Sequence, residues 1–224
     1  MSEVYLISGG SGSDMEMLTR DFRTALSSYG EFHPRVACIG AANGDSDSVF
    51  GYFQRPVRSA RAMLSLVPTS APDADAAFAR QMLEEADAVF LTGGDVEAGM
   101  EALRRMDLVE HLRGLHRAGK PFLGIEEGAV MLGRHWARWD RAEDDATASL
   151  VDCLGLVPMT FAVHGEERDW RDLKCVLRLL GPGAEGFGLA AGGAYRARDT
   201  GTLRGLRVPP VCFYNEGGAV KMRE

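Results

Sequence analysis

The sequence predicts an α/β protein, a three-layer α/β/α sandwich with a mainly parallel sheet and an antiparallel C-terminal edge. Two observations support this fold class. Short apolar runs alternate with amphipathic stretches of helical length through the first 135 residues, which is the pattern of β–α–β crossovers. The chain after residue 180 instead carries short strand-like runs joined by tight turns, which is typical of antiparallel strands.

The first half of the chain is expected to alternate strands and helices. The β-branched and aromatic run Val4–Ile7 predicts the first strand, and Leu18 and Phe22 share one face of a helix over 15–29. The same criteria predict strands over 35–39, 64–67 and 88–91, and helices within 41–61 and over 73–86, 96–105 and 108–118. Asp73 is the expected N-cap of the helix that begins there.

The second half begins with a buried strand over 122–125 and a short helix after it. A strand-like run over 160–164 ends at His164, and apolar residues recur at helical spacing over 166–180. Four short strands are expected over 187–190, 194–197, 203–206 and 211–214, and we expect them to form the antiparallel edge of the main sheet. No repeat or linker divides the chain, so residues 1–224 are expected to form a single domain.

Composition excludes several classes of function. The chain of 224 residues is 46% hydrophobic, enough for a sizeable core, and its net charge is -7. Nucleic acids and anionic membranes require a basic surface, and no apolar run reaches membrane-spanning length. We therefore expect no nucleic-acid partner and no membrane contact. No basic leader precedes the first strand, so a cytoplasmic location is expected.

Cysteine and histidine spacing indicates no metal and no cofactor. The four cysteines are scattered without a C-x-x-C pair, which favours reduced, buried thiols; they are Cys38, Cys153, Cys175 and Cys212. His111 and His116 lie five residues apart on one helix and do not share a face. We therefore expect no metal site.

The segment around Glu126 is the centre of the predicted site. Gly124 and Gly128 flank Glu126 in a G-x-E-x-G pattern that follows an apolar run. This is the spacing of the nucleophile elbow G-x-S-x-G, with a glutamate in place of the serine. The central residue of such a turn has a strained backbone, and the flanking glycines relieve crowding. The pattern predicts the scaffold of a hydrolase site without its hydroxyl.

Three loops are expected to converge on Glu126, because sites in parallel sheets form at the carboxyl ends of the strands. They contain Gly9-Gly10, Gly93-Gly94-Asp95 and Gly124–Gly128. Two alternatives stay open. The loop over 8–13 is either a phosphate cradle or a plain strand-to-helix loop, which is favoured because the P-loop lysine is absent. Asp95 either contacts substrate or caps the helix that begins at Val96.

Three stretches together resemble peptidase family S51, which contains dipeptidase E (aspartyl dipeptidase) and cyanophycinase and has the class I glutamine amidotransferase-like fold. They are residues 88–95, residues 119–133, and Val163-His164 with Arg168 four residues on. The resemblance implies a serine-type peptidase. In this family a histidine activates the elbow serine, and backbone amides near the Gly-Gly motif and after the nucleophile stabilise the oxyanion.

The resemblance also implies site residues in this chain. Glu126 stands in place of the serine, and His164 matches the base. Gly94 and Glu127 would offer the two oxyanion-hole amides, and the remaining candidates for oxyanion or substrate contacts are Gly93, Asp95 and Arg168. Three positions depart from the cyanophycinase-like pattern: Val96 replaces a glutamine, Ala162 an aspartate and Trp170 a second arginine. The family's specificity for acidic side chains is therefore not expected here.

Glu126 has no hydroxyl, so standard serine-peptidase chemistry is not expected unless a serine from elsewhere reaches the site. A retired enzyme whose pocket binds a small peptide or other small-molecule ligand is favoured. Glu126 is alternatively a nucleophile whose ester is hydrolysed by water activated by His164, or a general acid or base beside Glu127. A buried carboxylate needs a partner, and Arg168 or His164 would supply it. Monomer and homodimer both stay open.

Overall fold

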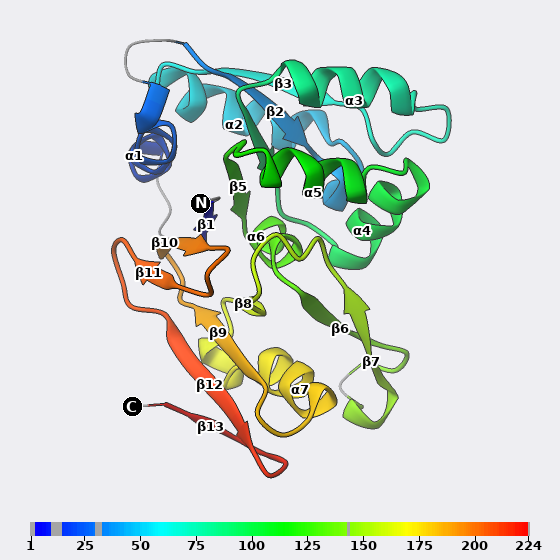
Figure 1. Ribbon diagram of the computed structural model, residues 1–224, viewed down its shortest axis with the longest axis vertical. Coiled ribbons are helices and arrows are strands. Elements are labelled where there is room, and N and C mark those ends of the chain that lie inside the picture. The colour runs from blue at the N-terminus through cyan, green and yellow to red at the C-terminus, as the bar shows by residue number, and fades with distance from the viewer. Residues whose placement is uncertain (1–2, 10–14, 30–32, 143, 224) are drawn as a thin grey trace.

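The structure is a computed structural model that describes residues 3–9, 15–29, 33–142 and 144–223. A seven-stranded sheet in this part of the chain has the order β11-β10-β1-β5-β4-β2-β3 (Figure 1). Its parallel strands are β1 (Glu3–Ile7), β5 (Phe122–Ile125), β4 (Ala88–Leu91), β2 (Arg35–Ile39) and β3 (Met63–Val67). Antiparallel β10 (Ala194–Arg198) and β11 (Leu203–Gly205) complete one edge. The predicted mainly parallel sheet with an antiparallel C-terminal edge is confirmed.

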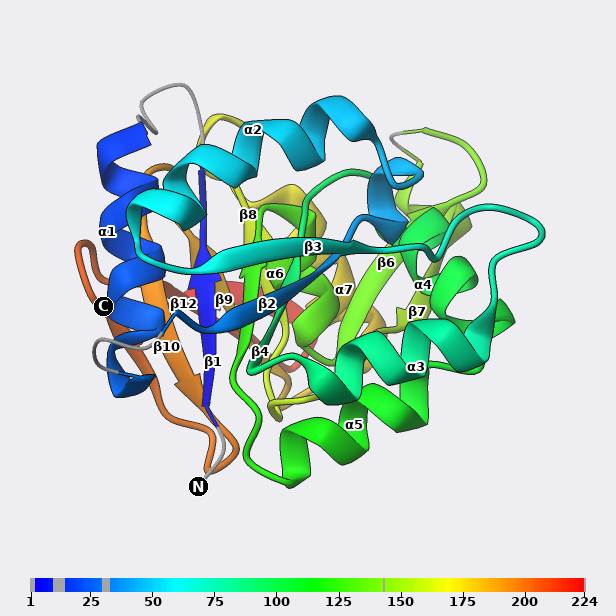
Figure 2. The same ribbon diagram turned by 90° about the horizontal axis from the view of Figure 1, so that it is seen from above.

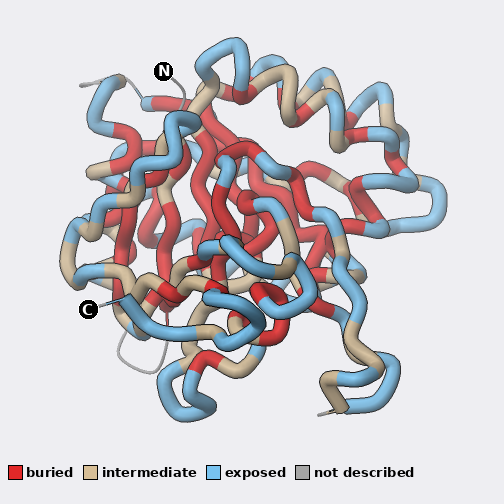
Figure 3. The backbone as a smooth tube through the Cα atoms, turned by 60° about the horizontal axis from the view of Figure 1, so that its bottom comes forward, coloured by how far each residue is buried: buried red, intermediate tan, exposed pale blue. Residues whose placement is uncertain are grey.

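Helices cover both faces of this sheet and complete the predicted three layers. The helices α1 (Met15–Ala25) and α2 (Asp47–Ser59) lie on one face, and α3 (Ala76–Glu85), α4 (Val96–Arg105) and α5 (Val109–Arg117) on the other (Figure 2). Alternate strand residues face opposite layers. In β4, Phe90 packs beneath α1 and α2, whereas Leu91 packs in the core of the opposite face. Figure 3 shows the buried residues concentrated along the central strands.

The C-terminal part of the chain builds a second sheet. Its strands are β8 (Phe161–Val163), β9 (Glu185–Leu189), β12 (Val211–Glu216) and β13 (Ala219–Met222), and α7 (Arg171–Leu180) packs against it (Figure 1). A further antiparallel pair consists of β6 (His135–Trp139) and β7 (Ala148–Asp152). The expected tail strands therefore divide between two sheets. Leu173 and Leu177 of α7 form a separate apolar cluster with Trp170 and Phe213, so β12 buries its inner face there rather than on the main sheet.

The start of α3 differs from its prediction. The N-cap is Asp75, whose carboxylate accepts two backbone N–H groups of the first turn. The prediction of Asp73 as N-cap is wrong. The residues before Asp75 form a turn in which the Ala74 N–H donates to the Ala71 carbonyl at 3.1 Å, so the helix begins after this turn closes.

Three further features concern function. No helix among the described residues combines the length and the apolar character needed to cross a membrane. The described residues also contain no group of three or more His, Cys, Asp or Glu side chains placed to hold a metal ion. The four cysteines are free thiols. Burial raises the pKa of Cys38 and of Cys153 to about 12, so both thiols stay protonated and unreactive near neutral pH.

Candidate active site

The elbow segment, residues 124–128, joins β5 to α6 (Glu127–Leu132) at the carboxyl end of the parallel strands. Glu126 has φ 54° and ψ -128°, the strained conformation that the spacing predicts. Both flanking glycines are required by close backbone approach. A Cβ atom at Gly124 would lie 2.5 Å from the Gly128 oxygen, and one at Gly128 would lie 2.3 Å from the Leu91 oxygen.

The structure brings Glu126 and His164 together. Glu126 Oε2 and His164 Nε2 are in direct contact, and the two side chains are 27% and 30% exposed, so both remain partly accessible to solvent. His164 follows β8, and its backbone N–H donates to the Leu189 carbonyl of β9. The pairing of β8 with β9 therefore positions the imidazole. The expected proximity of Glu126 and His164 is confirmed, and His164 is the partner of the Glu126 carboxylate.

The neighbouring Glu127 reaches the Gly-Gly loop with its side chain. Glu127 Oε2 accepts the Gly94 N–H at 3.0 Å. This N–H is one of the two amides that the resemblance assigns to the oxyanion hole, and here it donates to the Glu127 carboxylate. Gly93 leaves room for it, because a Cβ there would lie 2.9 Å from Glu127 Oε2. The role expected of Glu127 concerned its amide, and no sequence signal marked its side chain as an acceptor.

Asn43 holds the Gly-Gly loop from the end of β2. Its Nδ2 donates to the carbonyl of Gly93 and to the hydroxyl of Thr92, both at 2.7 Å. Asp95 caps α4, because its carboxylate accepts the Ala98 N–H at 2.9 Å. Of the two alternatives for Asp95, the structure shows the cap. The only sequence signal for Asn43 is its place after a strand that ends at the same edge of the sheet.

A cavity of about 300 Å³ opens beside the elbow segment, and we call it the elbow cavity. Its walls come from the Gly-Gly loop, the elbow and the apolar faces of α1 and α2; they are lined by Gly9, Leu18, Val49, Tyr52, Phe53, Gly93, Gly94, Ile125, Glu126 and Glu127. Leu18, Val49 and Phe53 are core-type residues in the sequence, whereas Tyr52 is 45% exposed. Their place in the first two turns of the helices after β1 and β2 directs them toward the site. Gly10, which was expected in the first of the three converging loops, lies outside the described residues, as does most of the loop over 8–13.

Among the described serines, Ser8 lies near the elbow. It follows Ile7, the last residue of β1, and the Ile7 carbonyl accepts the Glu126 N–H at 2.9 Å. Its side chain does not replace the missing nucleophile. Ser8 is fully buried, and its hydroxyl donates to the carbonyl of Leu189 at 2.8 Å. Substrate therefore does not reach the Ser8 hydroxyl in this arrangement.

The three positions that depart from the family pattern lie in different surroundings. Val96 and Ala162 line a small cavity of about 90 Å³ next to Glu127. Trp170 is buried, and its ring packs against Phe213 with centroids 6.2 Å apart. Arg168 lines a separate pocket of about 380 Å³ with tryptophan and arginine side chains of β6 and α7, rather than the elbow cavity.

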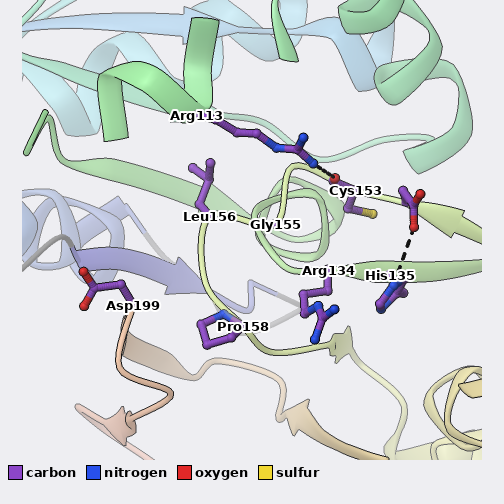
Figure 4. A pocket seen from close by; sticks show the side chains of 9 residues that line it. Arg113, Arg134, His135, Cys153, Gly155, Leu156, Pro158 and Asp199 are labelled. Carbon is purple, nitrogen blue, oxygen red and sulfur yellow. Dashed lines mark hydrogen bonds and ion pairs between the residues drawn. The ribbon is translucent and has the colours of Figure 1, made fainter. Parts of the chain in front are cut away.

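A cavity of about 510 Å³ lies away from the elbow, between α5, the start of β6 and the turn after β10 (Figure 4). Its Asp199 follows Arg198, which pairs with Glu3 at the opposite end of β1 from the elbow. Two of its polar side chains already have protein partners: the Arg113 guanidinium donates to the Leu154 carbonyl at 2.7 Å, and His135 Nε2 lies 3.5 Å from Asp152. Size alone therefore does not make this cavity the candidate active site.

Comparison with known proteins agrees with the fold. The model of peptidase family S51 matches residues 4–180. A crystal structure of a peptidase from an acI-B1 Actinobacterium has a TM-score of 0.70 at 15% identity, covering 100% of this chain and 94% of that one. A crystal structure described as a peptidase E protein from Listeria monocytogenes EGD-e has a TM-score of 0.68 at 15% identity, covering 93% of this chain and 99% of that one.

Because the sequence identities are low, these structural similarities establish the fold alone. Among curated proteins, none matches the sequence significantly. The family match extends from β1 through the Gly-Gly loop, the elbow and His164 to the end of α7. The chain belongs to peptidase family S51.

Proposed function

We propose that this chain is a divergent S51 protein that no longer carries out serine-peptidase chemistry and instead binds a small peptide or other small-molecule ligand at the elbow. One observation carries the proposal: carboxylates hold both positions that the peptidase reaction needs. Glu126 stands at the elbow against the imidazole of His164, and Glu127 accepts the Gly94 N–H. The nucleophile and half of the oxyanion hole are therefore replaced together.

The charge of Glu127 opposes the transition state of acyl transfer. A tetrahedral oxyanion about 4 Å from a carboxylate would be repelled by about 4 kcal/mol at an effective dielectric constant of about 20. A penalty of that size slows a reaction roughly a thousandfold. Replacement of the serine would already stop the reaction, and the Glu127 side chain adds a second, independent barrier to it.

The proposal is tested by turnover and by stepwise restoration of the site. We expect no hydrolysis of peptide or p-nitrophenyl ester panels by the unaltered chain. Glu126→Ser alone should stay inactive, because Glu127 still occupies the Gly94 N–H. The double variant Glu126→Ser with Glu127→Ala should hydrolyse esters at least about a hundredfold faster than the single variant, since one oxyanion donor is worth roughly that factor.

The matched control combines Glu126→Ser with Glu101→Ala, which removes an exposed carboxylate on α4 outside the elbow cavity. This control should stay as inactive as the single variant. Serine-type turnover by the unaltered chain, blocked by a fluorophosphonate that labels a serine, would refute the proposed function. Equal activity of the single and double variants would refute the role of the Glu127 side chain.

A second candidate function follows from the contact between Glu126 and His164. Glu126 could attack a saturated electrophilic carbon, expel its leaving group and form an ester at the side chain, or attack the acyl carbon of an ester, expel the alcohol and form a mixed anhydride. Water deprotonated by His164 would then hydrolyse that ester or anhydride and regenerate the carboxylate. Glu126 could instead act as the general base for water, with no covalent intermediate.

Mass spectrometry separates the two forms of this candidate. A covalent addition at Glu126 during turnover of an ester panel supports the nucleophile, whereas turnover without any addition that is lost in Glu126→Gln supports the general base. Turnover that survives Glu126→Ala excludes both. No turnover in the unaltered chain leaves ligand binding as the function of the site.

A further inference from the structure

Glu127 lines two cavities. One is the elbow cavity, and the other is the cavity of about 90 Å³, which we call the side cavity. The side cavity is lined mostly by apolar groups of α6, β6, β8 and α7; its residues are Val96, Glu127, Val130, Trp136, Phe161, Ala162, Val163, Asp172, Leu173 and Val176. The cyanophycinase-like pattern has polar side chains at the positions of Val96 and Ala162, whereas this chain has apolar ones there.

The charged side chains that line these two cavities are carboxylates, and one of them, Asp172, also lines the neighbouring pocket with Arg138, Arg168 and Arg171. Glu126, Glu127 and Asp172 supply three carboxylates, and among the described residues no lysine or arginine lines either cavity. The Glu126 carboxylate contacts His164, whereas Glu127 Oε2 accepts a neutral amide N–H. Two carboxylates therefore face a single imidazole in this group. A carboxylate against apolar walls is costly without a cation, so a positively charged ligand would be stabilised there.

The volume of the side cavity limits the apolar part of the ligand. A cavity of about 150 Å³ in a protein core accommodates benzene. The side cavity, at about 90 Å³, therefore suits a smaller group, on the order of four carbon atoms by the same comparison. A branched aliphatic group of this size would supply packing contacts to Val96, Ala162 and Val163, which otherwise face the cavity.

We propose that the elbow site binds a protonated aliphatic amine, with the branched hydrocarbon group in the side cavity and the ammonium group on the carboxylate of Glu127. This inference rests on the proposed ligand-binding function of the elbow. It assigns Glu127 a direct ligand contact and Ala162 a role in ligand size. The acidic side chains that the family resemblance implied as substrates would be repelled by the same carboxylates.

The test compares four small probes by isothermal titration calorimetry at pH 7.5. Isoamylamine should bind at least tenfold more tightly than isoamyl alcohol, which has the same shape without charge. It should also bind at least tenfold more tightly than ethylamine, which has the charge without the branched group. 4-Methylpentanoate should not bind measurably. Equal affinity for amine and alcohol, or tighter binding of the carboxylate, would overturn the assignment of a positively charged ligand. Equal affinity for both amines would overturn the placement of the branched group in the side cavity.

Variants locate the contact within the site. Glu127→Gln should weaken isoamylamine at least tenfold while changing the alcohol by less than threefold. Ala162→Val, which narrows the side cavity, should weaken isoamylamine and leave ethylamine unchanged. Glu101→Gln, an exposed carboxylate of α4 that lines neither cavity, is the matched control and should change nothing. Unchanged isoamylamine affinity in Glu127→Gln, in a variant that keeps the thermal stability of the parent, would overturn the proposal.

The result is separable from that of the proposed function. The signals of the His164 ring in NMR spectra report any ligand that enters the site, because this ring contacts Glu126. If a peptide or small-molecule panel shifts these signals and isoamylamine does not, the amine inference fails and ligand binding stands. Serine-type turnover refutes the proposed function without changing the order of amine and alcohol affinities.

Discussion

Two adjacent glutamates determine the chemistry of the elbow because their side chains leave it in different directions. Glu126 is the residue with positive φ at the turn, and its carboxylate meets His164. Glu127 is the first residue of α6, and its carboxylate meets the Gly94 N–H. The Gly94 N–H therefore already has an acceptor. Under the proposed function, this second carboxylate makes the site attract positive charge rather than stabilise negative charge.

The backbone of the elbow gives a prediction at the level of single residues. Gly128→Ala should lower the free energy of unfolding by about 3 kcal/mol or more, because the added Cβ would clash with a backbone oxygen that has no freedom to move. Gly51→Ala is the matched control. Gly51 lies exposed inside α2 with open space around its Cβ position, so this change should stabilise by about 0.5–1 kcal/mol.

Urea denaturation of both variants measures these changes. Similar effects of Gly128→Ala and Gly51→Ala would contradict the close approach between the elbow and β4. A change in the slope with denaturant would show that the variant altered the unfolded ensemble as well.

The sequence predicts the site residues unevenly. The contact between Glu126 and His164 was predictable, because each residue follows a strand and the resemblance to peptidase family S51 implies that the elbow residue and this histidine share one site. The bond from Gly94 to Glu127 was not, because two residues 33 positions apart form it only once the Gly-Gly loop and the elbow approach each other. Asn43 has no motif at all, and its two bonds to the loop follow from the turn after β2.

Capping decides where the individual elements begin. The start of α4 matched its prediction because Asp95 is the only side chain with a capping oxygen directly before the helix. Before α3 the sequence offers two such side chains, Asp73 and Asp75, and both satisfy the N-cap preference. The choice between them depends on the turn closed by Ala74 and Ala71, which the pattern of apolar residues does not reveal.

The cap gives a prediction at the level of the element. Asp75→Ala should lower the free energy of unfolding by about 1 kcal/mol, because two N–H groups of α3 lose their acceptor. Asp73→Ala removes an exposed aspartate of the preceding turn and should change stability by less than about 0.5 kcal/mol. Chemical denaturation of the two variants side by side measures the difference. A larger loss in Asp73→Ala would contradict the observed cap.

At the level of the whole molecule, the alternation of strands and helices was sufficient to predict the main sheet, its parallel direction and the layers that cover it. The second sheet was not predictable from the same pattern. Short strands such as β9 and β12 carry no signal for which sheet they join, and their partners are selected by the cluster that α7 forms with Trp170 and Phe213. Pairing of distant strands depends on packing, whereas helix and strand periodicity is local.

The buried His116 and the half-buried His135 make the stability of the whole molecule depend on pH. His116 of α5 packs edge-on against Phe122 with centroids 5.7 Å apart, and His135 starts β6. Burial lowers the pKa of His116, and burial together with Arg134 lowers the pKa of His135. In the unfolded chain both histidines take up protons near their ordinary pKa of about 6.5. The unfolded state therefore binds more protons below that pH, and stability present above about 6.5 is lost as the pH falls.

The urea midpoint should accordingly fall between pH 7.5 and pH 5.5 at constant ionic strength, and His116→Gln should flatten this dependence even if it lowers stability at every pH. His33→Gln, at an exposed position before β2, is the matched control and should keep the slope of the parent. A parent protein that gains stability on acidification, or a slope in His116→Gln equal to that of His33→Gln, would contradict the assignment. Because the comparison uses slopes, the carboxylates common to all three proteins cancel, and the difference reports the proton that His116 excludes from the core.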